Sequence, residues 1–205
     1  MGGIMLDSVK PGAVIDAIKA RRMWRNMHIR AGAGYIDGPV SEWPASGFTH
    51  LRSLGVRAVE ITVTGAESAD VADVEKGDLS PAAGAAWAAR EHEAGRFPCL
   101  YVNRSNKPAV LSECGSHGLS PGRDFALWVA TLDGGFTDIG GADLRQETGV
   151  VAVQAFSSVL LGIDADASVI TEQGNHWLRL EPLWEEDALA QSRALTKLLR
   201  EHIGA

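Results

Sequence analysis

The stretch Asp70-Val71-Ala72-Asp73-Val74-Glu75 is predicted to be a short β-strand that carries acidic side chains at its carboxyl end. Side chains alternate along an extended backbone, so Asp73 and Glu75 share one face of the strand. The following Lys76-Gly77-Asp78 ends the strand. Parallel α/β proteins carry their chemistry at the carboxyl ends of strands, so this acid pair is the first candidate for a functional site.

Two carboxylates held side by side repel each other, which raises the pKa of one of them. We expect Glu75 to be the protonated member, because partial burial and the charge of Asp73 would both raise its pKa. A proton donor beside a charged carboxylate is the combination that glycoside hydrolysis uses. The same sequence would also result from an Asp at the edge of a loop and a solvated Glu after an ordinary strand. The motif alone therefore does not distinguish a functional acid pair from a structural one.

Further strands and helices are predicted on both sides of this segment. The strands cover residues 28–36, 56–63, 97–102, 125–131 and 150–156, which are rich in apolar and β-branched residues. Helices are predicted over residues 11–23, from Ser80-Pro81 to Gly95, and over residues 105–114. Strands that alternate with helices predict parallel pairing and an α/β fold, and a closed barrel is the expected result.

We expect a single domain with three stretches: an N-terminal helix and lead-in over residues 1–28, a barrel over 29–178, and an amphipathic C-terminal helix over 179–205. In the last stretch, apolar residues recur at helical spacing: Trp184, Ala188, Leu195, Leu199 and Ile203. Packing of this stripe against the barrel is the simpler interpretation. Self-association of two copies through the same helix stays open.

Composition and charge exclude several classes of partner. The 205 residues carry a net charge of −7, and a surface that binds nucleic acid is basic, so no nucleic-acid partner is expected. No apolar run approaches the length that spans a bilayer, and residues 1–7 lack the pattern of a secretory signal. We therefore expect a cytoplasmic product without a membrane partner, which would need release to reach a cell wall, or incorporation into a virion.

Other chemistries lack their residue patterns. Cys99 and Cys114 do not have metal-ligand spacing and are expected to be buried thiols, and the six histidines show no zinc-type pair. Gly32-Ala33-Gly34 does not open a helix, because Pro39 and Trp43 follow, so it does not indicate a dinucleotide site. Neither a metal nor a cofactor is expected.

Acidic, amide and aromatic residues recur at the ends of the predicted strands. Asp37 follows the first of these strands and Asp166 follows the last. Tyr101, Trp128 and Gln154 lie in or near the ends of strands between them. Each has a simpler interpretation as a turn residue, a core aromatic or a buried amide. Their recurrence at one end of successive strands nevertheless predicts a barrel mouth lined by acidic and aromatic side chains. Such a lining is suited to binding a polysaccharide.

Six short motifs follow one another along the chain: Gly34-Tyr35-Ile36-Asp37-Gly38, Asp73-Val74-Glu75, Leu100-Tyr101-Val102-Asn103-Arg104-Ser105, Leu127-Trp128-Val129-Ala130, Val153-Gln154-Ala155-Phe156 and Asp166-Ala167-Ser168-Val169. In this order they resemble the family 25 glycoside hydrolases, which are lysozyme-like muramidases on an irregular (β/α) TIM-like barrel. The resemblance is closer to compact versions from actinobacteria and their phages, and it covers roughly residues 29–170.

The resemblance implies a peptidoglycan hydrolase that cleaves the β-1,4 bond after N-acetylmuramic acid without a cofactor. Glu75 would be the general acid, while Asp73 and Asp166 would flank the reacting sugar. Asp37 would complete the acidic floor of the site. The residues implied to bind the glycan are Tyr35, Tyr101, Trp128 and Gln154.

An alternative is a noncatalytic module that binds cell-wall glycan, or part of a phage virion, on the same barrel. Val63 and Asp70 are too close in sequence for the helix that the family has between its second and third strands. The aromatic residue that the family carries directly after Gln154 is displaced to Phe156. These differences favour a groove that binds glycan without cutting it, and an assay of hydrolysis distinguishes the two hypotheses.

Overall fold

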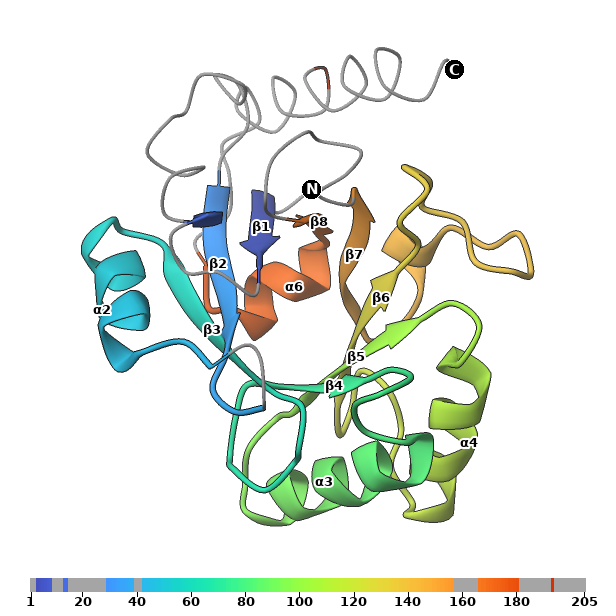
Figure 1. Cartoon of the computed structure of the whole chain (residues 1–205). Coiled ribbons are helices and arrows are strands. Elements are labelled where there is room, and N and C mark those ends of the chain that lie inside the picture. Colours follow the sequence, from blue (N-terminus) through green and yellow to red (C-terminus); the bar gives the residue numbers. More distant parts are fainter. Residues whose placement is uncertain are drawn as a thin grey trace.

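The structure is a computed structural model that describes residues 3–8, 13–14, 29–38, 42–156, 166–180 and 193. Eight strands form a closed barrel in chain order (Figure 1). Their bounds are Gly3–Asp7 for β1, Ile29–Tyr35 for β2, Arg57–Thr62 for β3, Val71–Val74 for β4, Cys99–Asn103 for β5, Ala126–Ala130 for β6, Val150–Phe156 for β7 and Asp166–Ile170 for β8. The expectation of a closed α/β barrel is therefore confirmed.

One strand of the barrel runs against the other seven. The pairs from β1–β2 to β6–β7 are all parallel, whereas β8 is antiparallel to both β7 and β1. The amino end of β8 therefore lies at the same end of the barrel as the carboxyl ends of the other strands. Asp166, the first residue of β8, pairs with Asp7, the last residue of β1. This corrects the expectation that Asp166 follows the last strand and that all strands are parallel.

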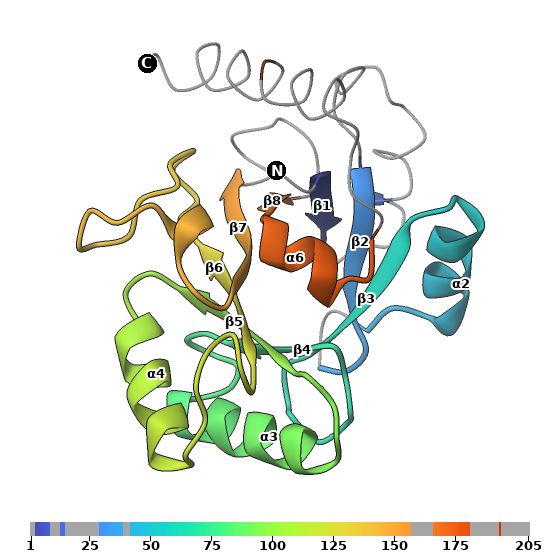
Figure 2. The ribbon, with the colours of Figure 1, turned by 180° about the vertical axis from the view of Figure 1, so that it is seen from behind.

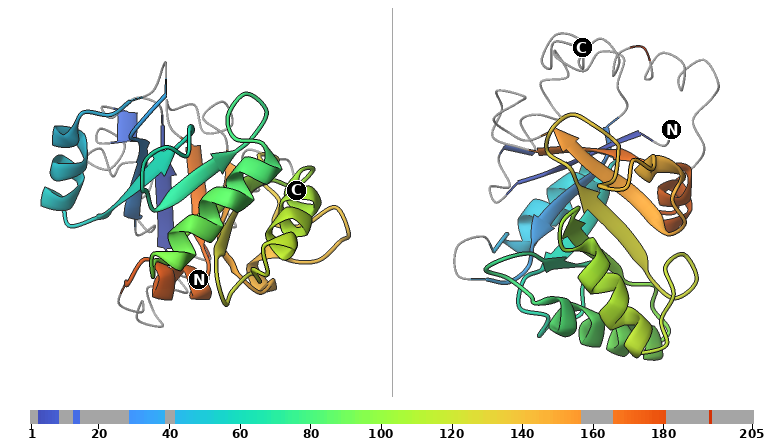
Figure 3. Two further views of the ribbon diagram at one scale, coloured as in Figure 1. Left: turned by 90° about the horizontal axis from the view of Figure 1, so that it is seen from below. Right: turned by 90° about the vertical axis from the view of Figure 1, so that its right-hand side faces the viewer.

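Four α-helices and one 3-10 helix lie in the described part of the chain. Their bounds are Ala45–Ser53 for α2, Pro81–Glu93 for α3, Lys107–Ser116 for α4, Glu172–Trp177 for α6 and Leu144–Gln146 for the 3-10 helix η1. The helices α2, α3 and α4 follow β2, β4 and β5 and lie outside the barrel, with α3 packed beside α4 (Figure 3). No helix separates β3 from β4, as the short spacing between these strands predicted.

Helix α3 begins and ends at the signals that predicted it. The side chain of Ser80 accepts a hydrogen bond from the backbone N–H of Ala83, Pro81 lies in the first turn, and Gly95 follows the helix with a φ of +77°. A Cβ added at Gly84 would lie 2.5 Å from Val74 Cγ2, so glycine allows α3 to pack closely on β4. Helix α4 begins and ends two residues later than predicted.

The strands separate two apolar cores. Outward-facing side chains such as Leu100, Leu127 and Val129 pack between the sheet and the surrounding segments. Inward-facing side chains such as Met5 and Cys99 fill the barrel itself. Because side chains alternate along each strand, the inward series continues towards the carboxyl end of the barrel.

Helix α6 lies at the end of the barrel opposite to the carboxyl ends of β1 to β7. Figures 1 and 2 view the molecule from opposite sides, and in Figure 2 the helix lies in front of β1. Thr171 caps α6 by accepting a hydrogen bond from Gly174 N, and its hydroxyl donates to Val150 O. Leu178, which follows the helix and is 3% exposed, packs against the inner core.

Several elements differ from the sequence-based expectation. The barrel includes β1, which falls within the stretch 1–28 that was expected to be a lead-in. The elements α2, β8 and α6 were not predicted. Of the predicted helix over residues 11–23, the structure describes Ala13 and Val14, which are helical. Of the predicted helix over residues 179–205, it describes Arg179 and Leu180, which are not helical, and the helical Arg193. The rest of both helices lies outside the described residues. The hypothesis of self-association through the C-terminal helix lies outside them as well.

Two smaller expectations concern the thiols and the membrane. Cys99 and Cys114 are buried free thiols, as predicted. In the part of the chain that the structure describes, no helix combines the length and apolar character needed to cross a bilayer.

Candidate functional site

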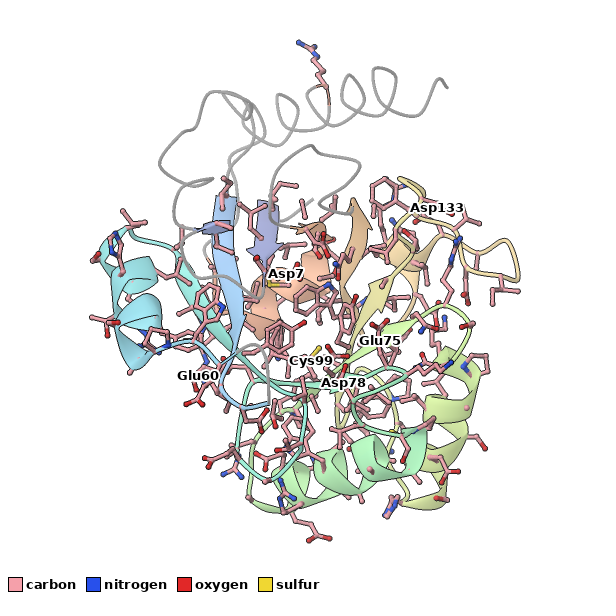
Figure 4. All side chains as sticks on the ribbon, viewed as in Figure 1. Asp7, Glu60, Glu75, Asp78, Cys99 and Asp133 are labelled. Atoms are coloured by element: carbon pink, nitrogen blue, oxygen red, sulfur yellow. The ribbon has the colours of Figure 1, made fainter. Side chains whose placement is uncertain are left out.

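Four acidic residues meet inside the carboxyl end of the barrel. Asp7 ends β1, Asp73 lies in β4, Glu75 directly follows β4, and Asp166 begins β8. They are close enough that the charges of the other three all act on the pKa of Asp7. Figure 4 shows Asp7 and Glu75 within the ring of strands, whereas Glu60 lies outside it. We call these four residues the acidic group.

Strand alternation places the acidic group in the barrel. Met5 and Val71 belong to the inner core, so Asp7 and Asp73, two residues further along their strands, point the same way. Since β8 runs in the opposite direction, its first residue rather than its last lies at this end. The apolar interior of the barrel therefore becomes acidic at its carboxyl end.

Asp73 is almost fully buried, with 4% exposure. Its Oδ2 accepts a hydrogen bond from the Tyr35 hydroxyl at 3.4 Å, while its buried Oδ1 has no partner among the described residues. Burial raises the pKa of Asp73 to about 8, the charges of Glu75 and Asp78 act in the same direction, and the Tyr35 hydrogen bond opposes them. Asp73 therefore holds a proton at neutral pH.

Asp7 has a similar environment. Burial raises its pKa well above the usual range for an aspartate, and the neighbouring carboxylates add to this rise. Its Oδ1 is also buried without a hydrogen-bond partner in the described part of the chain. Asp7 and Asp73 thus each present a buried acceptor oxygen that a donor group of a ligand could satisfy.

Glu75 is half-buried, which leaves it the most accessible of the carboxyl groups on β1 and β4. Its Oε1 accepts a hydrogen bond from Asn103 Nδ2 at 3.4 Å. The Asn103 side-chain oxygen accepts hydrogen bonds from Ser105 Oγ at 2.6 Å and Asn106 N at 2.9 Å, and this fixes the amide with its nitrogen towards Glu75. Asn103 at the end of β5 therefore orients the carboxyl group of Glu75.

The pKa of Glu75 is raised, as expected, but the causes differ from those expected. Burial raises the pKa of Glu75, the Asn103 hydrogen bond opposes this, and the charges of Asp78 and Asp166 add to it. The charge of Asp73 is not among the main causes. Instead, the charge of Glu75 raises the pKa of Asp73. Burial, and not the charge of Asp73, is therefore the main cause that raises the pKa of Glu75, which corrects the expected cause.

Gln154 positions Asp166. The side-chain Nε2 of Gln154 donates a hydrogen bond to Asp166 Oδ2 at 2.8 Å across β7 and β8. Gln154 is 2% exposed, and its Oε1 is buried without a partner among the residues described. Gln154 thus holds Asp166 in place and adds a third buried acceptor oxygen to those of Asp7 and Asp73. It does not line an open groove, which corrects the expected role.

The aromatic side chains of Tyr101 on β5 and Trp128 on β6 pack against each other. The rings of Tyr101 and Trp128 have centroids 5.1 Å apart and meet edge to face at 82°. Trp128 is fully buried, and its Nε1 donates to Ser168 Oγ at 2.8 Å. This corrects the expectation that Trp128 lines a glycan groove, because it lies fully buried in the barrel core beside its register partner Tyr101. Tyr35 is half-buried and is the more exposed of the two tyrosines.

Asp37 does not belong to the acidic group. Its carboxylate accepts hydrogen bonds from the hydroxyls of Thr62 and Thr64 and from Val63 N. Partial burial acts to raise the pKa of Asp37, but these hydrogen bonds outweigh it and hold the pKa below the usual range. Asp37 is therefore an ionised residue that joins the ends of β2 and β3, and the expectation that it completes the acidic floor is wrong.

Sequence reasoning missed Asp7, Asn103 and Asp78. The signal for Asp7 was present, since Gly3-Ile4-Met5-Leu6-Asp7 is a short apolar run that ends in an acid, like the strand around Asp73. Asp78 lies in the loop after β4, where its charge raises the pKa of Asp73 and Glu75.

Comparisons with known proteins give no further assignment. No known family, curated protein or solved structure matches the chain significantly. Within the described ranges, no three His, Cys, Asp or Glu side chains are arranged to hold a metal ion together.

Proposed function

We propose that the chain is a glycoside hydrolase of muramidase type, which cleaves the β-1,4 bond after N-acetylmuramic acid in peptidoglycan on an irregular (β/α) TIM-like barrel. The observation that supports this is the acidic group at the carboxyl end of the barrel. It brings together several carboxyl groups, and burial raises the pKa of Asp7, Asp73 and Glu75 among them. Glycoside hydrolysis needs a proton donor and a second carboxylate.

Glu75 is the general acid in this proposal. It is half-buried, so it can reach a bound glycan, and burial raises its pKa, which favours the protonated form that a general acid needs. Asn103 holds its carboxyl group so that the proton can pass to the leaving oxygen of the cleaved bond. Asp166, held by Gln154, carries the negative charge that stabilises the developing oxocarbenium ion or orients the acetamido group of the substrate.

Asp73 assists through hydrogen bonding. As a neutral carboxyl group at pH 7 it can both donate and accept, and its unpaired Oδ1 resembles that of Asp7. With the Oε1 of Gln154, three buried acceptors lie in and around the site. A sugar that brings several hydroxyl and N–H donors satisfies such acceptors, whereas an apolar ligand would leave them unpaired.

The experiment is hydrolysis of purified peptidoglycan, followed by the appearance of reducing ends. The Glu75→Gln protein should keep its circular dichroism spectrum and lose at least a hundredfold in rate, since general acids contribute roughly 10²–10⁴-fold. The matched control is Glu67→Gln, at an exposed glutamate in the β3–β4 loop, which should keep the wild-type rate. Hydrolysis by Glu75→Gln at the wild-type rate would refute the role of Glu75.

A noncatalytic glycan-binding module is the second candidate. The direct connection from β3 to β4, without the helix of the resembled family, favours it. In that case the wild-type protein co-sediments with purified walls but releases no reducing ends on prolonged incubation. Tyr35→Ala should then weaken co-sedimentation, because the half-buried ring of Tyr35 borders the acidic group.

A further inference from the structure

A cavity of about 720 Å³ opens at the end of the barrel opposite to the acidic group. The start of β3 and the segments before β4, β5, β6 and β7 line it, together with α6 and the residue Arg179 after it. Helix α6 lies towards the viewer in Figure 2. Its lining shares no residue with the candidate functional site. The volume lies within the range of sites that bind small molecules.

The lining of this cavity is basic. Arg57, Arg96 and Arg179 contribute to it, and Asp70 is the one acidic residue among the described residues that line it. Arg57 forms an ion pair with Asp70 at 3.3 Å, and Arg96 uses its Nε to bind Glu91. A guanidinium group has five N–H donors, so both arginines retain donors that can face a ligand.

Arg179 has an unusual backbone conformation. Its φ is +55°, and it directly follows Leu178 at the end of α6. The Leu180 N–H donates to Asn175 O at 2.8 Å across this turn, an arrangement in which glycine is the usual residue. An arginine is less favourable than glycine in this conformation. Arg179 is one of the residues that line the cavity.

Aromatic surface lies in the same cavity. Trp177 is half-buried and Phe97 is 42% exposed, and both line it. We propose that this cavity binds a small organic anion, whose phosphate or carboxylate group is held by Arg57, Arg96 and Arg179 and whose planar part packs against the two rings. Arginine suits this role because its planar fork binds both groups in a bidentate manner.

The probe is 1-naphthyl phosphate, titrated into the full chain by isothermal calorimetry. We expect binding to the wild-type protein and at least tenfold weaker binding to Arg179→Gly, because the guanidinium is lost while the backbone conformation is relieved. The unfolding temperature of Arg179→Gly without probe should equal or exceed that of the wild type, which separates lost binding from lost folding. Neutral 1-naphthol should bind more weakly than the phosphate, and comparison with 1-naphthoate identifies which anionic group is preferred.

The matched control is Leu132→Gly. Leu132 is the other non-glycine residue with a positive φ in the described ranges, at +58°, and it lies after β6 and outside the cavity lining. Its replacement should relieve the same kind of strain and leave the affinity for the probe unchanged. Glu75→Gln should also bind the probe normally, so the test is independent of hydrolysis. Equal affinity of Arg179→Gly and wild type, or a wild type that binds neither anion, overturns the proposal.

Discussion

Burial governs the protonation of individual residues at the mouth of the barrel. The pKa of Asp73 is raised from 3.8 to about 8, and desolvation is the largest cause. Asp37 has the same side chain but lies among donors, and its pKa is lowered. Two aspartates of one barrel therefore differ in charge at neutral pH, because one is buried beside other carboxyl groups and the other accepts hydrogen bonds from hydroxyls and a backbone N–H.

Asp73→Asn is expected to change how stability depends on pH. Unfolded Asp73 releases its proton near pH 3.8, whereas the folded protein holds it up to about pH 8. Between these values the folded state binds more protons, so the free energy of unfolding falls as pH rises, by at most about 1.4 kcal/mol per pH unit. Asparagine resembles the neutral carboxyl group, so Asp73→Asn should have a shallower slope and exceed the wild type in stability at pH 8.

Urea denaturation of both proteins at pH 5, 6, 7 and 8 measures this difference. Asp37→Asn is the control, because the lowered pKa of Asp37 places its titration below this range and its slope should match that of the wild type. Parallel stability curves for Asp73→Asn and wild type would show that the Asp73 carboxyl is ionised in the folded protein.

At the residue scale, sequence reasoning found positions more reliably than roles. Alternation along a strand was enough to place Asp73 and Glu75 at the barrel mouth, and both lie there, at the carboxyl end of β4. It could not show that hydroxyl groups of the next strand would bind Asp37, or that Trp128 would turn towards Ser168. Those outcomes depend on partners that are distant in sequence, and contacts of this kind are not visible in the sequence alone.

Among the elements, α6 depends on one glycine for its place against the barrel. A Cβ at Gly174 would collide with the backbone oxygen of Val151 and lie 2.7 Å from Ile170 Cγ2. A backbone atom of β7 cannot move aside easily, because this strand is paired on both sides. The close approach of α6 to β7 therefore requires glycine at this position.

Gly174→Ala should lower the free energy of unfolding by about 1–3 kcal/mol, because the helix has to shift away from β7. Gly115→Ala in α4 is the matched control, since no atom lies within 4 Å of the added Cβ. Alanine favours helix over glycine, so this control should be unchanged or more stable by up to about 1 kcal/mol. Urea denaturation compares the two, and equal effects would show that contact with Val151 does not limit α6.

The sequence predicted elements well where local signals were strong. The apolar run of β7 and the Ser80-Pro81 start of α3 gave the right elements. Helix α2 was missed because Pro44 caps it without a side-chain hydrogen bond and its first turn has no acid. Strand β8 was missed because Asp166 resembles a turn residue, and an antiparallel strand after a parallel series has no local signal.

Across the whole molecule, polar and apolar layers alternate along the barrel axis. The acidic group lies at one end, the inner core follows, and the arginine-lined cavity lies beyond it. Within the core, Trp128 on β6 is hydrogen-bonded to Ser168 on β8, two strands that are not neighbours in the sheet. This hydrogen bond crosses the barrel interior and is surrounded by the apolar side chains of the inner core.

Ser168→Ala should destabilise the whole barrel by about 1–3 kcal/mol, because the indole N–H of Trp128 is left buried without a partner. In a Trp128→Phe background the same change should have a smaller effect, since no donor remains. A double-mutant cycle measured by urea denaturation gives the coupling between the two residues. Identical effects of Ser168→Ala in both backgrounds would mean that the hydrogen bond contributes no stability.

The position of β1 between β2 and β8 has a consequence for synthesis on the ribosome. One edge of β1 stays without its neighbour until residues 166–170 have been translated and released from the exit tunnel. Pairing between segments so far apart in the chain forms slowly, and an open strand edge is a template for aggregation. The facing edges of β1 and β7 therefore stay unpaired during synthesis until β8 is available to close the barrel between them.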